Sequence, residues 1–187
     1  MPPSTVVPIS KKWPARIVVP VALVFSVVGY ITVAFATGPE SIGALVAAFI
    51  SLGIGIGAAE TVSNELVLSS APPAKAGAAS AVSETAYELG AVLGTTVLGG
   101  ILTALYRTNL VIPEGIPDAA AEAASETLAG AVHAAGEIGG TAGDALFTAA
   151  ATAFDAGVTV TALIGAALVV VAGVIAATTL GGSRQKS

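Results

Sequence analysis

Four long stretches of this chain contain no charged side chain, and they constrain its fold more than any other feature. They are residues 17–39, 41–59, 89–106 and 156–183, and a helix of roughly 20 apolar residues crosses a hydrocarbon core about 30 Å thick. Only 10% of the residues are charged, against about 25% in a soluble domain. The sequence therefore predicts an all-α integral membrane protein with four transmembrane helices, at 16–37, 41–64, 77–106 and 153–181.

The basic residues are distributed unevenly about these four helices. Arg107 falls on one side, and the other six fall on the opposite side: Lys11, Lys12, Arg16, Lys75, Arg184 and Lys186. Basic residues are enriched in cytoplasmic loops, so both termini are predicted to lie in the cytoplasm, in a multi-pass protein of the cell (inner) membrane. The first apolar run is longer than the roughly 7–15 residues of a signal-peptide core, which favours a retained helix. Trp13 and Tyr106 lie near predicted interfaces, as belt aromatics do.

Residues 107–152 are predicted to be an extracytoplasmic loop with one or two short helices. Asp118 is a candidate N-cap after Pro117, and the Gly139-Gly140 pair should break the helix. Acidic residues recur at intervals of four, as Glu114, Asp118, Glu122 and Glu126. This pattern favours a solvated acidic face, and the alternative is a field that concentrates cations at a pore mouth.

Two acidic residues, Glu84 and Glu88, lie inside the third predicted helix. Their spacing puts both side chains on one face. If the helix enters the membrane near Gly77, they lie roughly 10 and 16 Å deep in a core about 30 Å thick. Each acid there costs about 2.5–3.5 kcal/mol, so the span needs helix neighbours, a wet cavity or protonation. Such residues indicate a proton or cation site; the alternative is a structural hydrogen-bond network, or Glu84 snorkelling to the inner interface.

Other polar residues share helical faces with these acids or lie on the second helix. Glu60 could equally lie at the cytoplasmic mouth, whereas the other candidates are predicted to face a cavity. The candidate pore-lining residues are Ser80, Tyr87, Thr95, Glu60 and Asn64. Small residues let membrane helices approach closely, and the candidate packing glycines are Gly53, Gly57, Gly90 and Gly94.

Several other function classes lack the residues they need. The chain has no cysteine, and its single histidine, His133, cannot form a metal site alone. Gly53, Gly55 and Ala58 loosely match a dinucleotide fingerprint, but no βαβ context surrounds them. No nucleophile–base pair, phosphate loop or basic nucleic-acid patch is present. The sequence therefore predicts neither an enzyme nor a cofactor, metal or nucleic-acid binder.

Residues 76–102, AGAASAVSETAYELGAVLGTTVLGGIL, resemble the penultimate helix of fourteen-helix drug:proton antiporters of the major facilitator superfamily. This is the branch that includes quaternary-ammonium efflux proteins, which carry an A-V-x-E-x-x-Y-D/E-L-G pattern. The matching residues are Ala81, Val82, Glu84, Tyr87, Glu88, Leu89 and Gly90. Ser83 stands where some relatives carry a further acid. The Gly-x-Gly-x-Gly helix, the PPAKAG loop and the outside hairpin are similar too, so the chain resembles the last four helices of the carboxy-terminal bundle.

The resemblance implies proton-coupled efflux of cationic or amphipathic drugs across the lipid bilayer. It assigns cation recognition and proton coupling to Glu84 and Glu88. A rocking mechanism needs two bundles around one site. A chain with four helices is therefore expected to be incomplete, and to be inactive without the missing amino-terminal transporter half. The alternative is a structural or regulatory four-helix membrane protein that docks onto a larger complex.

The distribution of basic residues generates a topology prediction. A reporter fused after Ser187 should be cytoplasmic, and a tag placed near Glu126 should be accessible from outside. Labelling of intact cells with a membrane-impermeant reagent measures both positions. A tag near Glu126 that is protected until the membrane is broken would contradict the four-helix topology.

Overall fold

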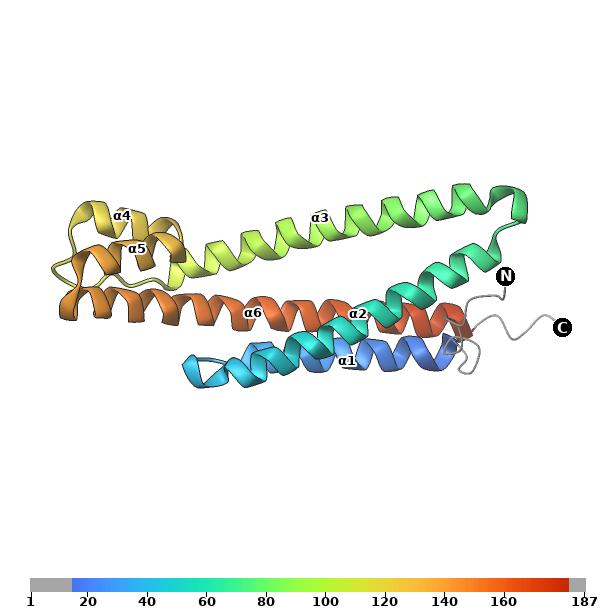
Figure 1. Cartoon of the computed structure of the whole chain (residues 1–187), viewed down its shortest axis with the longest axis horizontal. Helices are drawn as coiled ribbons and strands as arrows, with labels where there is room; N and C mark the ends of the chain where they lie inside the picture. The colour runs from blue at the N-terminus through green and yellow to red at the C-terminus, as the bar shows by residue number, and fades with distance from the viewer. Residues whose placement is uncertain (1–14, 182–187) are drawn as a thin grey trace, which may run out of the picture.

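The structure is a computed structural model that describes residues 15–181, and every regular element in that range is a helix (Figure 1). The shorter elements are η1 (Pro39–Ser41), η2 (Pro73–Lys75), α4 (Asp118–Glu126) and α5 (Leu128–Ile138). The four long helices are α1 (Ala15–Phe35), α2 (Ile42–Ser70), α3 (Ala76–Asn109) and α6 (Gly140–Gly181). Each of the four is long and apolar enough to cross a membrane. The predicted all-α fold class with four membrane helices is confirmed.

The helix bounds differ most from the prediction at two places. α2 continues to Ser70 rather than ending at 64, and α6 begins at Gly140 rather than at 153. Residues 140–152 are therefore helix and not loop, because the segment is rich in alanine, the strongest helix former. The break before it is where the sequence predicts it, since Gly139 and Gly140 adopt φ values of 66° and 55°, which glycine tolerates.

The predicted cap of the first outside helix is wrong. The N-cap of α4 is Pro117, without a side-chain hydrogen bond, and Asp118 is the first helical residue. Its carboxylate stabilises the helix from the first turn by its charge, which complements the positive end of the helix dipole.

Helices α1 and α6 pack antiparallel in a fixed register. The hydroxyl of Thr159 donates a hydrogen bond to the carbonyl of Ala34 at 2.9 Å, near the end of α1. Gly165 lies against the ring of Tyr30, where a Cβ would come within 2.8 Å of it. The 21 residues of α1 span about 31 Å, close to one hydrocarbon thickness. The part of α6 before Thr159 therefore projects beyond the end of α1, as Figure 1 shows.

This projecting part of α6 supports the α4–α5 subdomain, which comprises α4, α5 and residues 140–155. Its core holds one large side chain, Leu146, together with Tyr106 and a set of small residues. The small core residues are Ala124, Ala131, Ala134, Ala135, Ala150 and Ala153. Alanine cores let helices approach closely, so the α4–α5 subdomain is a packed unit.

Tyr106 ties α3 to this subdomain. Its hydroxyl donates a hydrogen bond to the carbonyl of Ala124 at 2.7 Å, and its ring meets Phe154 edge-on at 6.5 Å between centroids. The side chain is only 2% exposed, so Tyr106, which the sequence places near an interface, packs its ring inside the protein. Trp13, the other predicted belt residue, lies outside the described residues.

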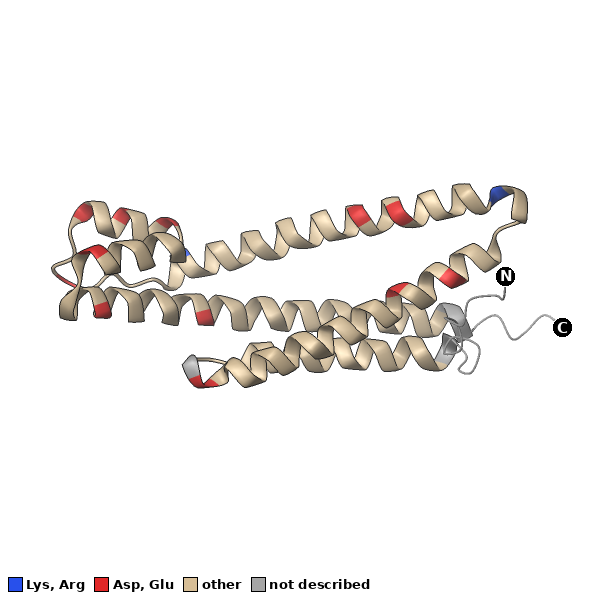
Figure 2. Cartoon of the chain, viewed as in Figure 1, with Lys and Arg blue, Asp and Glu red and all other residues tan. Residues whose placement is uncertain are grey.

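The acidic residues of the subdomain face outward. Figure 2 shows acidic positions along α4, α5, the preceding loop and the first part of α6. The exposed ones are Glu114, Asp118, Glu122, Glu126, Glu137 and Asp144, and Asp155 is half-buried. His133 is exposed as well and lies one turn from Glu137. The arrangement matches the predicted solvated face.

The alanine core generates a stability prediction. Leu146→Ala should destabilise the subdomain by about 2–5 kcal/mol, because Leu146 is the largest fully buried side chain and its loss leaves a cavity. Hydrogen exchange of the α4 and α5 amides in detergent measures this local opening. The matched control is Val132→Ala, at a position 46% exposed on α5. Equal exchange in the two variants would contradict the packed core.

Candidate functional site

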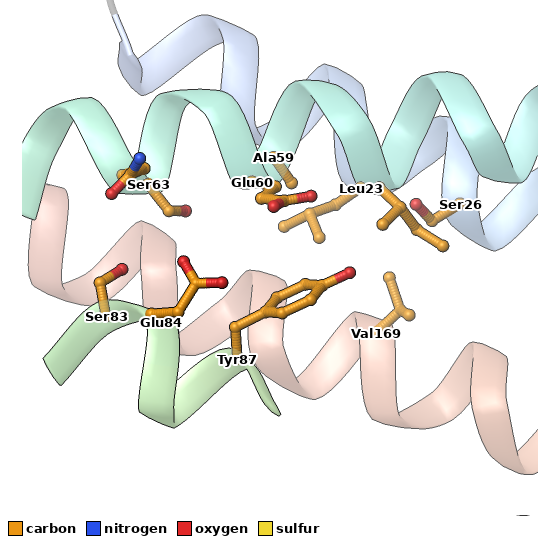
Figure 3. Close-up of a pocket in the computed structure, with 11 residues that line it drawn as sticks. Leu23, Ser26, Ala59, Glu60, Ser63, Ser83, Glu84, Tyr87 and Val169 are labelled. Carbon is orange, nitrogen blue, oxygen red and sulfur yellow. The ribbon is translucent and has the colours of Figure 1, made fainter. Parts of the chain in front are cut away.

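Helices α2 and α3 face each other across a cavity of about 380 Å³ that also reaches α1 and α6. Figure 3 shows Glu84 projecting from α3 toward Ser63 and Glu60 of α2, and the ring of Tyr87 extending along the cavity toward Val169. The lining residues are Leu23, Ser26, Ile56, Ala59, Glu60, Ser63, Asn64, Ser83, Glu84, Tyr87 and Val169. The cavity therefore gathers side chains from all four long helices.

The cavity runs from the middle of the bundle toward the end that holds η2. Leu23 and Ser26 lie near the centre of α1. The hydroxyl of Ser51 on α2 donates to the carbonyl of Phe25 at 2.8 Å, which fixes the level of α2 against α1. Glu60 follows Ser51 along α2, so it lies closer to the η2 end. In Figure 3 the hydroxyl of Tyr87 points toward the end of the cavity nearest the middle of the bundle, where Ser26 and Val169 lie.

The cavity carries negative charge with no basic side chain in its lining. Glu60 and Glu84 are both exposed to it, and in residues 15–181 neither carboxylate has a hydrogen bond or an ion-pair partner. Two carboxylates on opposite walls, with no basic side chain in the lining, can attract a cation between them. Residues Ser63, Ser83, Asn64 and Tyr87 add hydroxyl and amide groups, so the site suits a small cation with polar and aromatic contacts.

The structure brings four of the predicted site residues together: Glu84, Tyr87, Glu60 and Asn64. Glu88 lies one helical turn from Glu84 but does not line the cavity, and neither do Ser80 and Thr95. The hydroxyl of Thr95 donates to the carbonyl of Ala91 within its own helix at 2.7 Å. The reason is the divergence of α3 from its neighbours, since only about one turn of α3 meets the cavity (Figure 1).

Three serines that the sequence did not predict as site residues line the cavity: Ser26, Ser63 and Ser83. Ser63 follows Glu60 by three positions, which is a usable signal for a shared helix face, and Ser83 precedes Glu84. Ser26 is different, since it is the only serine of a mostly apolar helix, 3% exposed, and it donates to the carbonyl of Ala22 at 3.3 Å. No pattern in the sequence marks such a residue.

The glycine that packs α2 against α1 is Gly55, and this corrects the predicted set. A Cβ on Gly55 would collide with the hydroxyl of Ser26 and with backbone atoms of α1. By contrast, nothing lies within 4 Å of a Cβ built at the four predicted packing positions, Gly53, Gly57, Gly90 and Gly94. Close approach needs a glycine on the contacting face. Of the three alternating glycines of α2, only Gly55 lies on the face that contacts α1.

Comparison with known proteins places this fold and cavity in context. Residues 5–95 match the family model of the Major Facilitator Superfamily. The chain thus has an all-helical fold with four helices long and apolar enough to cross a membrane, and its first half is similar to the Major Facilitator Superfamily.

Two relatives illustrate that kinship. The chain is similar to the multidrug efflux pump LfrA of Mycolicibacterium smegmatis, with 41% identity over 170 residues, which is 91% of this chain and 34% of the pump. It is also similar to the methyl viologen resistance protein SmvA of Salmonella typhimurium, with 34% identity over 103 residues, 55% of this chain and 21% of that protein. The chain thus spans about a third or less of the length of these relatives.

The packing role of Gly55 generates a prediction. Gly55→Val should lower the stability of the bundle by about 1–3 kcal/mol, because overpacking forces α1 and α2 apart. The melting temperature of the detergent-solubilised protein measures the effect. Gly53→Val makes the same chemical change in the same helix where there is open space, so it should melt like the parent. An equal loss of stability in both variants would show that the α1–α2 contact at Gly55 is not responsible.

Proposed function

We propose that this chain is the last four-helix part of a fourteen-helix, proton-coupled antiporter that exports cationic or amphipathic drugs. In this proposal both termini lie in the cytoplasm, and the cavity opens toward the cytoplasmic side through its η2 end. The observation that carries the proposal is the pairing of Glu60 and Glu84 across a cavity without a basic partner.

The cavity offers separate contacts to the charge and to the apolar body of a drug. The carboxylates of Glu60 and Glu84 attract the cationic group. The ring of Tyr87 projects into the cavity (Figure 3) and can bind a cation over its face. Leu23 and Val169 supply apolar surface at the central end. The name of SmvA refers to methyl viologen, which is itself an organic cation, and this supports a cationic substrate.

Proton coupling follows from competition for the same carboxylates. A proton on Glu84 neutralises the charge that holds the cation, so proton entry favours cation release on the outside. Glu88 lies one turn nearer the subdomain end of α3, outside the lining set. We propose that it shares the proton-coupling role with Glu84, as the resemblance to the antiporter pattern implies.

Transport is proposed for the assembled carrier. Alternating access needs two bundles that rock around one site, and this chain spans about a third of the length of LfrA. The partner implied is therefore the amino-terminal half of such a carrier, which would cover the cavity from the side that α3 leaves open.

The test is efflux in an intact carrier that contains this segment, driven by an imposed pH gradient. Glu84→Gln and Glu88→Gln should each lower cation efflux by about tenfold or more, the effect of losing roughly 1.4 kcal/mol of cation- or proton-binding free energy. Glu60→Gln should weaken cation binding. Glu65→Gln is the matched control, since Glu65 lies on α2 outside the cavity lining, and it should transport like the parent.

Protein abundance separates this proposal from a structural role of the acids. Parent-like efflux in both the Glu84 and Glu88 variants would show that these carboxylates are not the proton-coupling site. If abundance collapses while the remaining carriers work normally, the acids hold the helices together, and the reading as a structural or regulatory four-helix protein gains support.

A further inference from the structure

The acidic cavity has a second polar feature at the end nearest the middle of the bundle, away from its carboxylates. Ser26 of α1 and Tyr87 of α3 both line the cavity. Figure 3 shows the hydroxyl of Tyr87 directed toward the end where Ser26 and Val169 lie. We call the hydroxyls of Ser26 and Tyr87 the two central hydroxyls.

Apolar side chains surround the two central hydroxyls. Leu23, Ile56 and Val169 line the cavity with them. Behind Leu23 and Val169 lies an apolar groove between α1 and α6, so hydrocarbon continues beyond this end of the cavity. A polar group in such surroundings costs free energy unless it is hydrogen-bonded. The two central hydroxyls therefore favour a ligand that brings a polar group to this end.

Each central hydroxyl has hydrogen-bonding capacity left for a ligand. Ser26 donates to the carbonyl of Ala22 at 3.3 Å, which leaves the lone pairs of its oxygen free to accept. Gly55 leaves the space that this hydroxyl occupies, because a Cβ there would collide with it. Within residues 15–181 the hydroxyl of Tyr87 has no hydrogen-bond partner, so it can donate or accept. A ligand hydroxyl, which both donates and accepts, matches this pair.

The helices set the distance between the two central hydroxyls and the carboxylates. Gly55 packs against Ser26 and so fixes the level of this end on α2. Glu60 follows Gly55 by five residues, which is a rise of about 7.5 Å along the helix. On the opposite wall Glu84 precedes Tyr87 by three residues, again toward the η2 end. The cavity thus presents a cation-binding end and a hydroxyl-binding end about 7–8 Å apart.

We propose that the cavity selects organic cations that carry a neutral hydroxyl about 7–8 Å from the charged centre, and that Ser26 and the hydroxyl of Tyr87 bind that group. A site built to hydrogen-bond a ligand hydroxyl disfavours the analogue that lacks it, because the polar groups of the site are then left unpaired. This inference rests on the proposed function, since it specifies which cations the same cavity takes.

The test compares two cations that differ by one hydroxyl. They are para-hydroxyphenylethyl-trimethylammonium and phenylethyl-trimethylammonium, and equilibrium binding of each radiolabelled cation is measured with the full chain in lipid nanodiscs. The parent should bind the hydroxylated cation about fivefold more tightly, the effect of a net hydrogen-bond contribution of about 1 kcal/mol. Ser26→Ala and Tyr87→Phe should each reduce this preference to about twofold or less, because each removes one partner of the ligand hydroxyl.

Two further variants make the result specific. Ser51→Ala removes a hydroxyl from the same α1–α2 contact, where Ser51 donates to the carbonyl of Phe25 outside the cavity lining. It should keep the preference of the parent. Glu84→Gln should weaken binding of both cations by a similar factor and leave their ratio unchanged, because it acts on the charge that the two ligands share.

The outcomes separate this inference from the proposed function. Equal binding of the two cations by the parent, with both weakened in Glu84→Gln, would overturn the hydroxyl preference and leave the cation site standing. A parent preference that persists in both Ser26→Ala and Tyr87→Phe would place the ligand hydroxyl elsewhere and overturn the inference too. If neither cation binds the parent, or if Glu84→Gln binds both like the parent, the cation site fails and both proposals fail with it.

Discussion

The hydrocarbon core of the membrane is the constraint on which this structure depends. Inside it, backbone groups must bond within the protein, and a helix satisfies them without a partner. Side-chain hydroxyls obey the same rule, since Thr32 donates to the carbonyl of Val28 and Thr95 to that of Ala91. Once these groups are satisfied locally, the helices are free to differ in how closely they pack, and this freedom creates the cavity.

Packing is uneven across the four long helices, and the unevenness defines the site. Gly55 and Gly165 let α2 and α6 approach α1 closely, whereas α3 is attached to α6 mainly at the subdomain end through Leu102, Leu105 and Tyr106. The opposite half of α3 therefore stands away from α6 (Figure 1). Glu84 occupies that half, which is why its carboxylate faces Glu60 across open space instead of a helix surface.

Prediction from sequence succeeded where a single helix decides the outcome. The four spans follow from hydropathy, and the break at Gly139-Gly140 follows from backbone freedom. It failed where contacts between helices decide. Tyr106 is an aromatic residue near a predicted interface, as belt residues are. In the structure its side chain is buried and its hydroxyl donates to the carbonyl of Ala124. The spacing of Gly53 and Gly57 is typical of a packing motif, yet the contacting face of α2 passes through Gly55. In the site, the sequence places Glu84 on a polar face but does not show that Glu60 is its neighbour.

The sequence by itself determined that the chain is a set of apolar helices, that acids lie within the third of them, and that basic residues flank the first and last. These properties depend on side-chain chemistry and on helix periodicity, which are local. Only the tertiary structure decided that Glu60, Glu84 and Tyr87 share one cavity, that Glu88 stands outside it, and that an apolar groove lies behind Leu23 and Val169. These properties depend on the relative rotation and divergence of helices far apart in the chain, and those follow from close contacts such as Thr159 with Ala34.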